Sequence, residues 1–179
     1  MKPLKEFTIP FVGLKLGEHH FDFEIKRAFF EYFEYEEFND ANIQVDVDFV
    51  KKSTLLELHF KASGYVNINC DVTNEPYNQD IDNEFDLVVK FGDEFNDENI
   101  DILVIPHGSY ELSIQQYIYE LIVLSVPIKR VHPGVTDGSL GSEILEKLEA
   151  LSPKLKDKKE TNEEIDPRWN TLKKLLTDK

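Results

Sequence analysis

Alternating apolar and polar residues run through much of the first hundred positions. The clearest examples are "NIQVDVDFVKK" and "TLLELHFKASGYVNINCDVTN", which place one apolar set on a single face: Ile43, Val45, Val47, Phe49, Leu56, Leu58 and Phe60. A period of two is typical of a strand with one buried face. "EFDLVVKFGD" and "NIDILVIPHG" predict two more strands, on either side of the acidic turn "GDEFNDEN". "KEFTIPFVGL" and "GEHHFDFEIK" predict an N-terminal hairpin.

Two segments change to the period of a helix. "IKRAFFEYFEYEEF" puts Ala28, Phe29, Tyr32 and Phe33 on one side, and we expect this aromatic stripe to lie in the core. "ELSIQQYIYELIVLSVP" is the strongest helix prediction, with Ser113 and Gln116 in a capping box and Pro127 as its end. A helix this apolar should be buried against the sheet.

These elements predict an α+β fold, a strongly bent antiparallel sheet or open barrel of five or six strands with two packed helices and a mobile C-terminal tail. Residues 1–133 would form the core domain, 134–165 a flexible polar linker with a short helix at "SEILEKLEALS", and 166–179 an amphipathic helix. The chain lacks the βαβ alternation and glycines of Rossmann or P-loop proteins.

Charge narrows the choice of partners. The 179-residue chain carries −15, and residues 154–179 hold eight Lys and Arg against six Asp and Glu, which leaves −17 on the rest. A surface of this sign repels phosphates, so it disfavours DNA and membranes and favours a basic partner. With no signal peptide or apolar span in the sequence, and one cysteine, we expect a cytoplasmic monomer.

The chemical candidates point away from catalysis and cofactors. One cysteine and five scattered histidines cannot supply the four spaced ligands of a zinc site. Cys70 has no Lys, Arg or His within five residues, which predicts a buried, inert thiol. Ser109 lacks the G-x-S-x-G elbow. We therefore expect no enzyme, metal or cofactor.

The stretch "DIDNEFDLVVKFGDEFNDENID" holds nine carboxylates against Lys90 and fails the calcium-loop pattern. It is either a solvated face that keeps sheet edges from pairing or a docking surface for a basic partner. The candidate docking residues are Asp93, Glu94, Asp97 and Glu98.

"DPRWNTLKKLL" near the C-terminus predicts a capped amphipathic helix. Asp166 suits the N-cap and Pro167 the first helical position, while Trp169, Leu172, Leu175 and Leu176 share one face. So short a helix needs a surface to pack on. It either docks back on the body or recognises a partner. The candidate partner-binding residues are Asp166, Pro167, Arg168, Trp169, Leu172, Lys173 and Leu176.

Three stretches together resemble the YceD family, bacterial and plastid proteins linked to accumulation of the large-subunit ribosomal RNA. "GYVNINCD" (64–71) resembles that family's strand running into a first cysteine, "LSIQQYIYELIVLSVPIKRVHP" (112–133) its central helix with Glu120 and a closing Leu-Ser-x-Pro, and "DPRWNTLKKLL" its terminal element. The resemblance covers most of 60–176. It implies a small, non-enzymatic factor in large-subunit assembly, acting on ribosomal RNA maturation or on a ribosomal protein.

One departure concerns metal. Many members carry cysteine pairs after the strand and after the central helix, suggestive of a metal site, whereas here Cys70 is followed by Asp71, Val72 and Thr73 and "HPGVTDGSLGSE" has no cysteine. Metal binding is not carried over.

Several functional hypotheses stay open. In the first, the acidic surface binds a basic ribosomal protein or a pre-ribosomal particle. In the second, ribosomal RNA is bound by the basic tail: Lys154, Lys156, Lys158, Lys159, Arg168, Lys173 and Lys174. The others are a general protein-interaction module and a metal-dependent hydrolase using the carboxylates of 93–101, whose spacing does not support it.

Overall fold

The computed structural model describes residues 4–140 and 143–151. The chain divides into two compact units, Met1–Ser142 and Glu143–Lys179. All strands that the structure describes lie in the first unit, and the mixed α+β class is confirmed.

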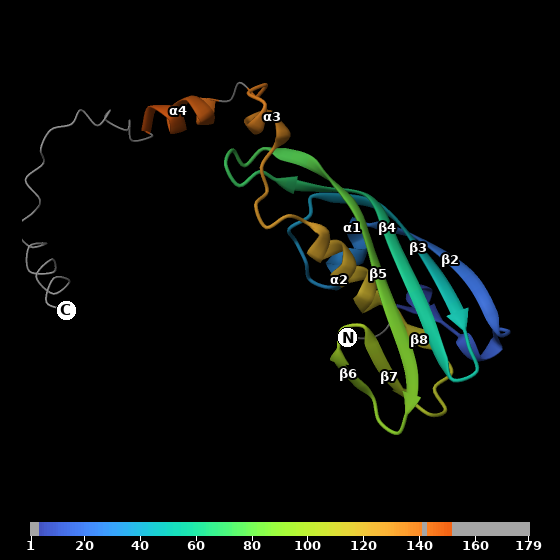
Figure 1. Ribbon diagram of the computed structural model, residues 1–179. Helices are drawn as coiled ribbons and strands as arrows, with labels where there is room; N and C mark the ends of the chain where they lie inside the picture. Colours follow the sequence, from blue (N-terminus) through green and yellow to red (C-terminus); the bar gives the residue numbers. More distant parts are fainter. Residues whose placement is uncertain (1–3, 141–142, 152–179) are drawn as a thin grey trace, which may run out of the picture. The chain divides into compact units, whose positions relative to one another are not determined.

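A six-stranded sheet forms the body of the first unit (Figure 1). Its strands, in spatial order, are β2 (Gly17–Lys26), β3 (Asp40–Lys51), β4 (Leu55–Asn69), β5 (Pro76–Gly92), β7 (Ile102–Pro106) and β6 (Asn96–Asn99). The sheet is not closed into a barrel, and β2 and β6 form its edges.

The prediction of a wholly antiparallel sheet is wrong at one pair, because β7 runs parallel to β5 from Ile102 beside Val88 to Pro106 beside Gly92. After β5 the chain first reverses into the exposed β6 and then reverses again into β7. β7 therefore returns in the direction of β5 and lies between β5 and β6.

The predicted N-terminal hairpin is also wrong. β1 (Thr8–Ile9) pairs with β8 (Leu112–Ser113), 104 residues further on, rather than with β2. The cause is burial: Phe7, Ile9 and Phe11 are each at most 3 % exposed, which a two-stranded ribbon with β2 could not provide. The backbone N–H of Ile114 donates to the carbonyl of Phe7 at 2.9 Å.

Helices α1 (Arg27–Tyr32) and α2 (Gln115–Ser125) lie against one face of the sheet (Figure 1). The ring of Tyr117 in α2 stacks on Phe85 at 6.1 Å and lies 6.3 Å from Phe60, centroid to centroid. The predicted inward positions are confirmed, since all of them are at most 2 % exposed: Ile43, Val45, Val47, Phe49, Leu56, Leu58 and Phe60.

Local details of both helices differ from the prediction. Ala28 is exposed, and Phe30 is buried instead, with its ring 4.8 Å from the ring of Phe38. The capping box of α2 does not form: Ile114 is the N-cap and no side chain caps it. Ser113 is already part of β8, opposite Thr8. The helix ends at Ser125, before Pro127, as predicted.

Gly64 allows β3 and β4 to approach closely. Its φ is +147°, and a Cβ built on it would lie 2.3 Å from the carbonyl oxygen of Asn42 and 2.8 Å from Cα of Ile43. Only a residue without a side chain fits here.

Two further described helices follow α2 in sequence, α3 (Pro133–Thr136) in the first unit and α4 (Glu143–Leu151) in the second. Helix α4 confirms the short helix predicted at "SEILEKLEALS". The predicted helix at 166–179 lies outside the described residues. No helix within 4–140 or 143–151 is long and apolar enough to cross a membrane.

Candidate functional site

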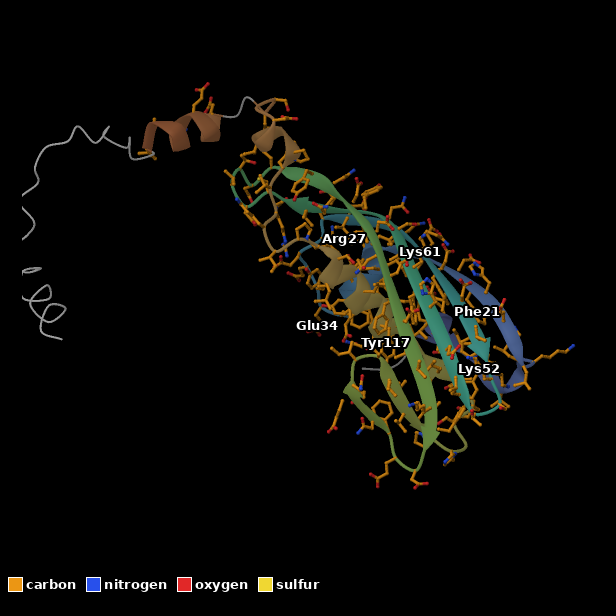
Figure 2. All side chains as sticks on the ribbon, viewed as in Figure 1. Phe21, Arg27, Glu34, Lys52, Lys61 and Tyr117 are labelled. Atoms are coloured by element: carbon orange, nitrogen blue, oxygen red, sulfur yellow. The ribbon has the colours of Figure 1, made fainter. Side chains whose placement is uncertain are left out.

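The side of the sheet away from α1 and α2 carries a regular array of charges. Pairing of β2, β3, β4 and β5 aligns their outward residues in four cross-strand rows, which we call the acidic face. The rows are His20–Asp48–His59–Asp86, Asp22–Asp46–Lys61–Glu84, Glu24–Gln44–Ser63–Asp82 and Lys26–Asn42–Tyr65–Asp80. Figure 2 shows Lys61 and, on the opposite side of the sheet, Tyr117.

The acidic face has eight carboxylates and two lysines among its sixteen positions. Its side chains are exposed or half-buried, and no element of the first unit is packed over them in Figure 1. Because the carboxylates are exposed to water on one side of the open sheet, their negative potentials add, so the face attracts cations and basic groups.

Two histidines lie within this array, each beside a carboxylate. His20 Nδ1 is 2.8 Å from Asp48 Oδ1, and His59 Nδ1 is 2.7 Å from Asp86 Oδ1. The hydrogen bond to Asp48, with the charges of Asp48, Asp46 and Asp22, outweighs desolvation and raises the pKa of His20 above its ordinary value of 6.5. Acidification therefore reduces the negative charge of the face.

Several carboxylates of the acidic face are not neutralised. Asp22 lies directly opposite Asp46 in the β2–β3 pair, and like charges in that position destabilise a sheet. Asp22, Asp80 and Asp82 make no ion pair within the described part of the chain. The folded protein thus holds a charge pattern that costs it stability.

The structure divides the long acidic stretch of 80–101 between two places. Asp93 and Glu94 lie in the turn after β5, and Asp97 and Glu98 in the edge strand β6, all four exposed. The carboxylates of the same stretch that reach the acidic face are those on β5: Asp80, Asp82, Glu84 and Asp86. Those of β2 and β3 were missed, although the polar half of the strand alternation marks them.

Cys70 lies where the end of β4 meets the segment after α2. It is buried, as predicted, at 2 % exposure. The backbone N–H groups of Val72 and His132 donate to its sulfur at 3.4 and 3.3 Å. Burial raises the pKa of the Cys70 thiol, but hydrogen bonds from His132, Thr73 and Val72 outweigh it and lower the pKa to about 7. The backbone N–H of His132 is 62 residues away in sequence, so this contact could not be predicted from the residues around Cys70.

Two segments meet in what we call the Cys70 corner, residues 70–73 after β4 and residues 130–132 after α2. Asp71 N–H donates to the carbonyl of Arg130 at 2.7 Å, and Arg130 N–H donates to Asp71 Oδ2 at 2.8 Å. The guanidinium of Arg130 also pairs with Glu37. Within the described residues no group of three or more His, Cys, Asp or Glu side chains is placed to hold a metal ion. Hydrogen bonds and an ion pair hold this corner together.

Fold and surface define a small α+β protein whose open sheet is apolar on one side and acidic on the other. Residues 58–176 match the family described as large ribosomal RNA subunit accumulation protein YceD, and the chain belongs to that family. The matched region begins in β4 and includes β5, α2 and the Cys70 corner. No curated protein and no solved structure matched the chain. The family supports a role in ribosome biogenesis, with ribosome-related partners.

Proposed function

We propose that this protein is a non-enzymatic factor in large ribosomal subunit biogenesis that holds a basic ribosomal protein on its acidic face. The observation that carries the proposal is the array of eight carboxylates against two lysines, exposed or half-buried in the described part of the chain. Ribosomal proteins are rich in Lys and Arg because they bind RNA. A protein surface of opposite sign would steer such a partner into contact and neutralise it before RNA does.

The cost of the acidic face supports this role. Asp22 facing Asp46 weakens the sheet, and a folded protein gains nothing from the contact on its own. A basic partner would neutralise both carboxylates on binding. The stability lost in the free protein would then be recovered as binding free energy in the complex.

The exposed carboxylates of Asp93, Glu94, Asp97 and Glu98, in and before β6, would add to the negative charge that attracts the partner. The C-terminal residues predicted to bind a partner, from Asp166 to Leu176, lie outside the described residues. In the proposal they secure the complex through the apolar face of Trp169 and Leu172. No catalytic step is needed.

A capture experiment tests the proposal. The tagged full chain is compared with Asp22→Asn/Asp80→Asn/Asp82→Asn, which removes three charges from the acidic face. Its matched control is Glu6→Gln/Glu34→Gln/Glu36→Gln, which removes three exposed charges from outside the acidic face. At physiological salt, wild type and control should capture ribosomal proteins, identified by mass spectrometry. The variant Asp22→Asn/Asp80→Asn/Asp82→Asn should capture them weakly. High salt should release them from all three.

Two outcomes would contradict the proposal. One is capture of neither a ribosomal protein nor a pre-ribosomal particle by wild type under gentle, low-salt conditions. The other is equal loss in the acidic-face variant and in its control, which would show a dependence on net charge alone.

A second candidate function is ribosomal RNA binding by the tail. It is favoured by the charge of residues 154–179, which carry a net +2 on an otherwise acidic chain. Replacing Lys173 and Lys174 by Gln should then abolish RNA retention, and retention should fall steeply with salt. Retention that is insensitive to salt would exclude this candidate.

A further inference from the structure

A cavity lies at the edge of the first unit, outside the acidic face. Its volume is about 650 Å³, within the range of ligand sites in proteins. Its walls come from α2, from residues 83–85 of β5, and from the segment of β6 and β7. The stacked rings of Phe85 and Tyr117 belong to it, so the cavity reaches into the packed core.

Large apolar side chains are exposed on the lining of this cavity. Phe95 is 60 %, Ile100 80 % and Leu124 80 % exposed, and all three line it. They come from the turn before β6, the turn after it, and α2. Apolar residues from separate elements gathered in one place are the usual mark of an interaction site.

The charged residues that line the cavity are all acidic. Three acidic residues line it besides Glu84, whose carboxylate lies on the other side of the sheet beside Lys61: Asp97, Glu111 and Glu120. Among the described residues of the lining there is no Lys, Arg or His. Burial, with the charges of Asp97 and Glu120, raises the pKa of Tyr117 to about 12, which places both carboxylates near that ring. The cavity therefore has its own negative charge, separate from that of the acidic face on the other side of the sheet.

We propose that this cavity binds a basic amphipathic segment of the ribosomal protein partner. The partner's apolar side chains would contact Ile100 and Leu124, while its Lys and Arg residues would pair with Asp97, Glu111 and Glu120. Nucleic acid would be repelled by the same carboxylates. This inference rests on the proposed function and deepens it, because the acidic face gives charge attraction whereas the cavity selects a particular segment.

Two synthetic peptides of the same Leu and Lys composition serve as probes. In one the leucines form a single helical face, and in the other the order is permuted so that no apolar face forms. Binding of each labelled peptide to the full chain is measured by fluorescence anisotropy. The amphipathic peptide should bind more tightly, because only it can fill the cavity and reach the carboxylates together.

The variant Ile100→Ser/Leu124→Ser removes two apolar contacts that are exposed in the free protein, so it should fold. Its affinity for the amphipathic peptide should be about a hundredfold weaker, roughly tenfold for each buried side chain, and its affinity for the permuted peptide should be unchanged. The matched control is Leu16→Ser/Ile128→Ser, two exposed apolar residues that do not line the cavity. It should bind both peptides like wild type.

Equal affinity for the two peptides, or unchanged affinity in Ile100→Ser/Leu124→Ser, would overturn the cavity proposal. A concentration-dependent dimer that this variant abolishes would also overturn it, since the occupant would then be a second copy of the chain.

Capture of ribosomal proteins separates the two proposals. If Ile100→Ser/Leu124→Ser captures them normally and the acidic-face variant does not, the cavity proposal fails and the proposed function stands. If no ribosomal protein is captured although the peptide result holds, the ribosomal role fails and the site stands.

Discussion

The two faces of the sheet are built by the same strands and differ in almost every respect. On β4, Phe60 is fully buried beneath α2 and its neighbour Lys61 is exposed on the other side. The inner face has the composition that stability requires, with close-packed aliphatic and aromatic side chains. The outer face lowers stability instead. Asp22 lies opposite Asp46, and Asp80 and Asp82 also lack an ion pair within the described residues. A face that costs stability points to function rather than to folding.

The largest effect should come from the inner face. Phe60→Ala removes a fully buried ring that lies near Phe85 and Tyr117, and should lower the free energy of unfolding by about 3–5 kcal/mol. Lys61→Ala, one residue away on the outer face, should change it by no more than about 0.5 kcal/mol. Urea denaturation measures both. Similar losses in the free energy of unfolding for the two variants would contradict the different contributions of the two faces to stability.

A substitution at Gly64 tests the close approach of β3 and β4 within the sheet. Gly64→Ala should cost about 1–3 kcal/mol, because its Cβ would meet the backbone of Asn42 and because φ is positive. Ser63→Ala, at the neighbouring exposed position, is the control. Thermal unfolding followed by circular dichroism compares them. A neutral Gly64→Ala would show that the close approach of β3 and β4 is not a constraint.

Cys70 adds a titrating group to the buried side. Since the folded-state pKa of about 7 lies below the ordinary thiol value, the thiolate stabilises the folded state at high pH, and this contribution is lost as pH falls through about 7. Relative to Cys70→Ala, the wild type should gain stability between pH 7 and 9. Denaturation midpoints across this range measure the gain. Parallel curves for the two proteins would rule out the lowered pKa.

A smaller effect of opposite sign is expected on the outer face. Asp22→Asn/Asp80→Asn/Asp82→Asn should raise the free energy of unfolding by roughly 0.5–1 kcal/mol at low ionic strength, because it removes repulsion between exposed carboxylates. The gain should shrink in high salt. Melting temperatures at two salt concentrations test this. Destabilisation by these substitutions would mean that the carboxylates support the fold.

The smallest effect concerns pH and the acidic face. Hydrogen bonding to Asp48 raises the pKa of His20 above 6.5, so the His20–Asp48 pair stabilises the fold fully below pH 6.5 and less as pH rises through the raised value. Protonation also lowers the negative charge of the face, so a basic partner should bind more weakly at pH 5.5 than at 7.5. His20→Gln should reduce this difference, while His107→Gln, off the acidic face, should leave it unchanged. Titration with the basic partner at both pH values measures the difference in affinity.

Much of the fold could be predicted because strand alternation and helical period are local properties. The inward positions from Ile43 to Phe60 and the end of α2 before Pro127 agree with the structure. The predictions that failed depend on distant partners. β1 pairs with β8 rather than β2, Ser113 joins a strand instead of capping α2, and β7 lies parallel to β5. Propensity cannot choose between such pairings, because burial of distant residues decides them.

The candidate site shows the same division. Sequence alone determined that the chain is acidic, which residues alternate out of the core, and which motifs resemble the YceD family. Only the tertiary structure decided that carboxylates from four strands share one open face, that His132 reaches Cys70, and that Ile100 and Leu124 line one cavity. The physical reason is that charge and period belong to single segments, whereas a surface or a cavity exists only once strand register and helix packing bring distant segments together.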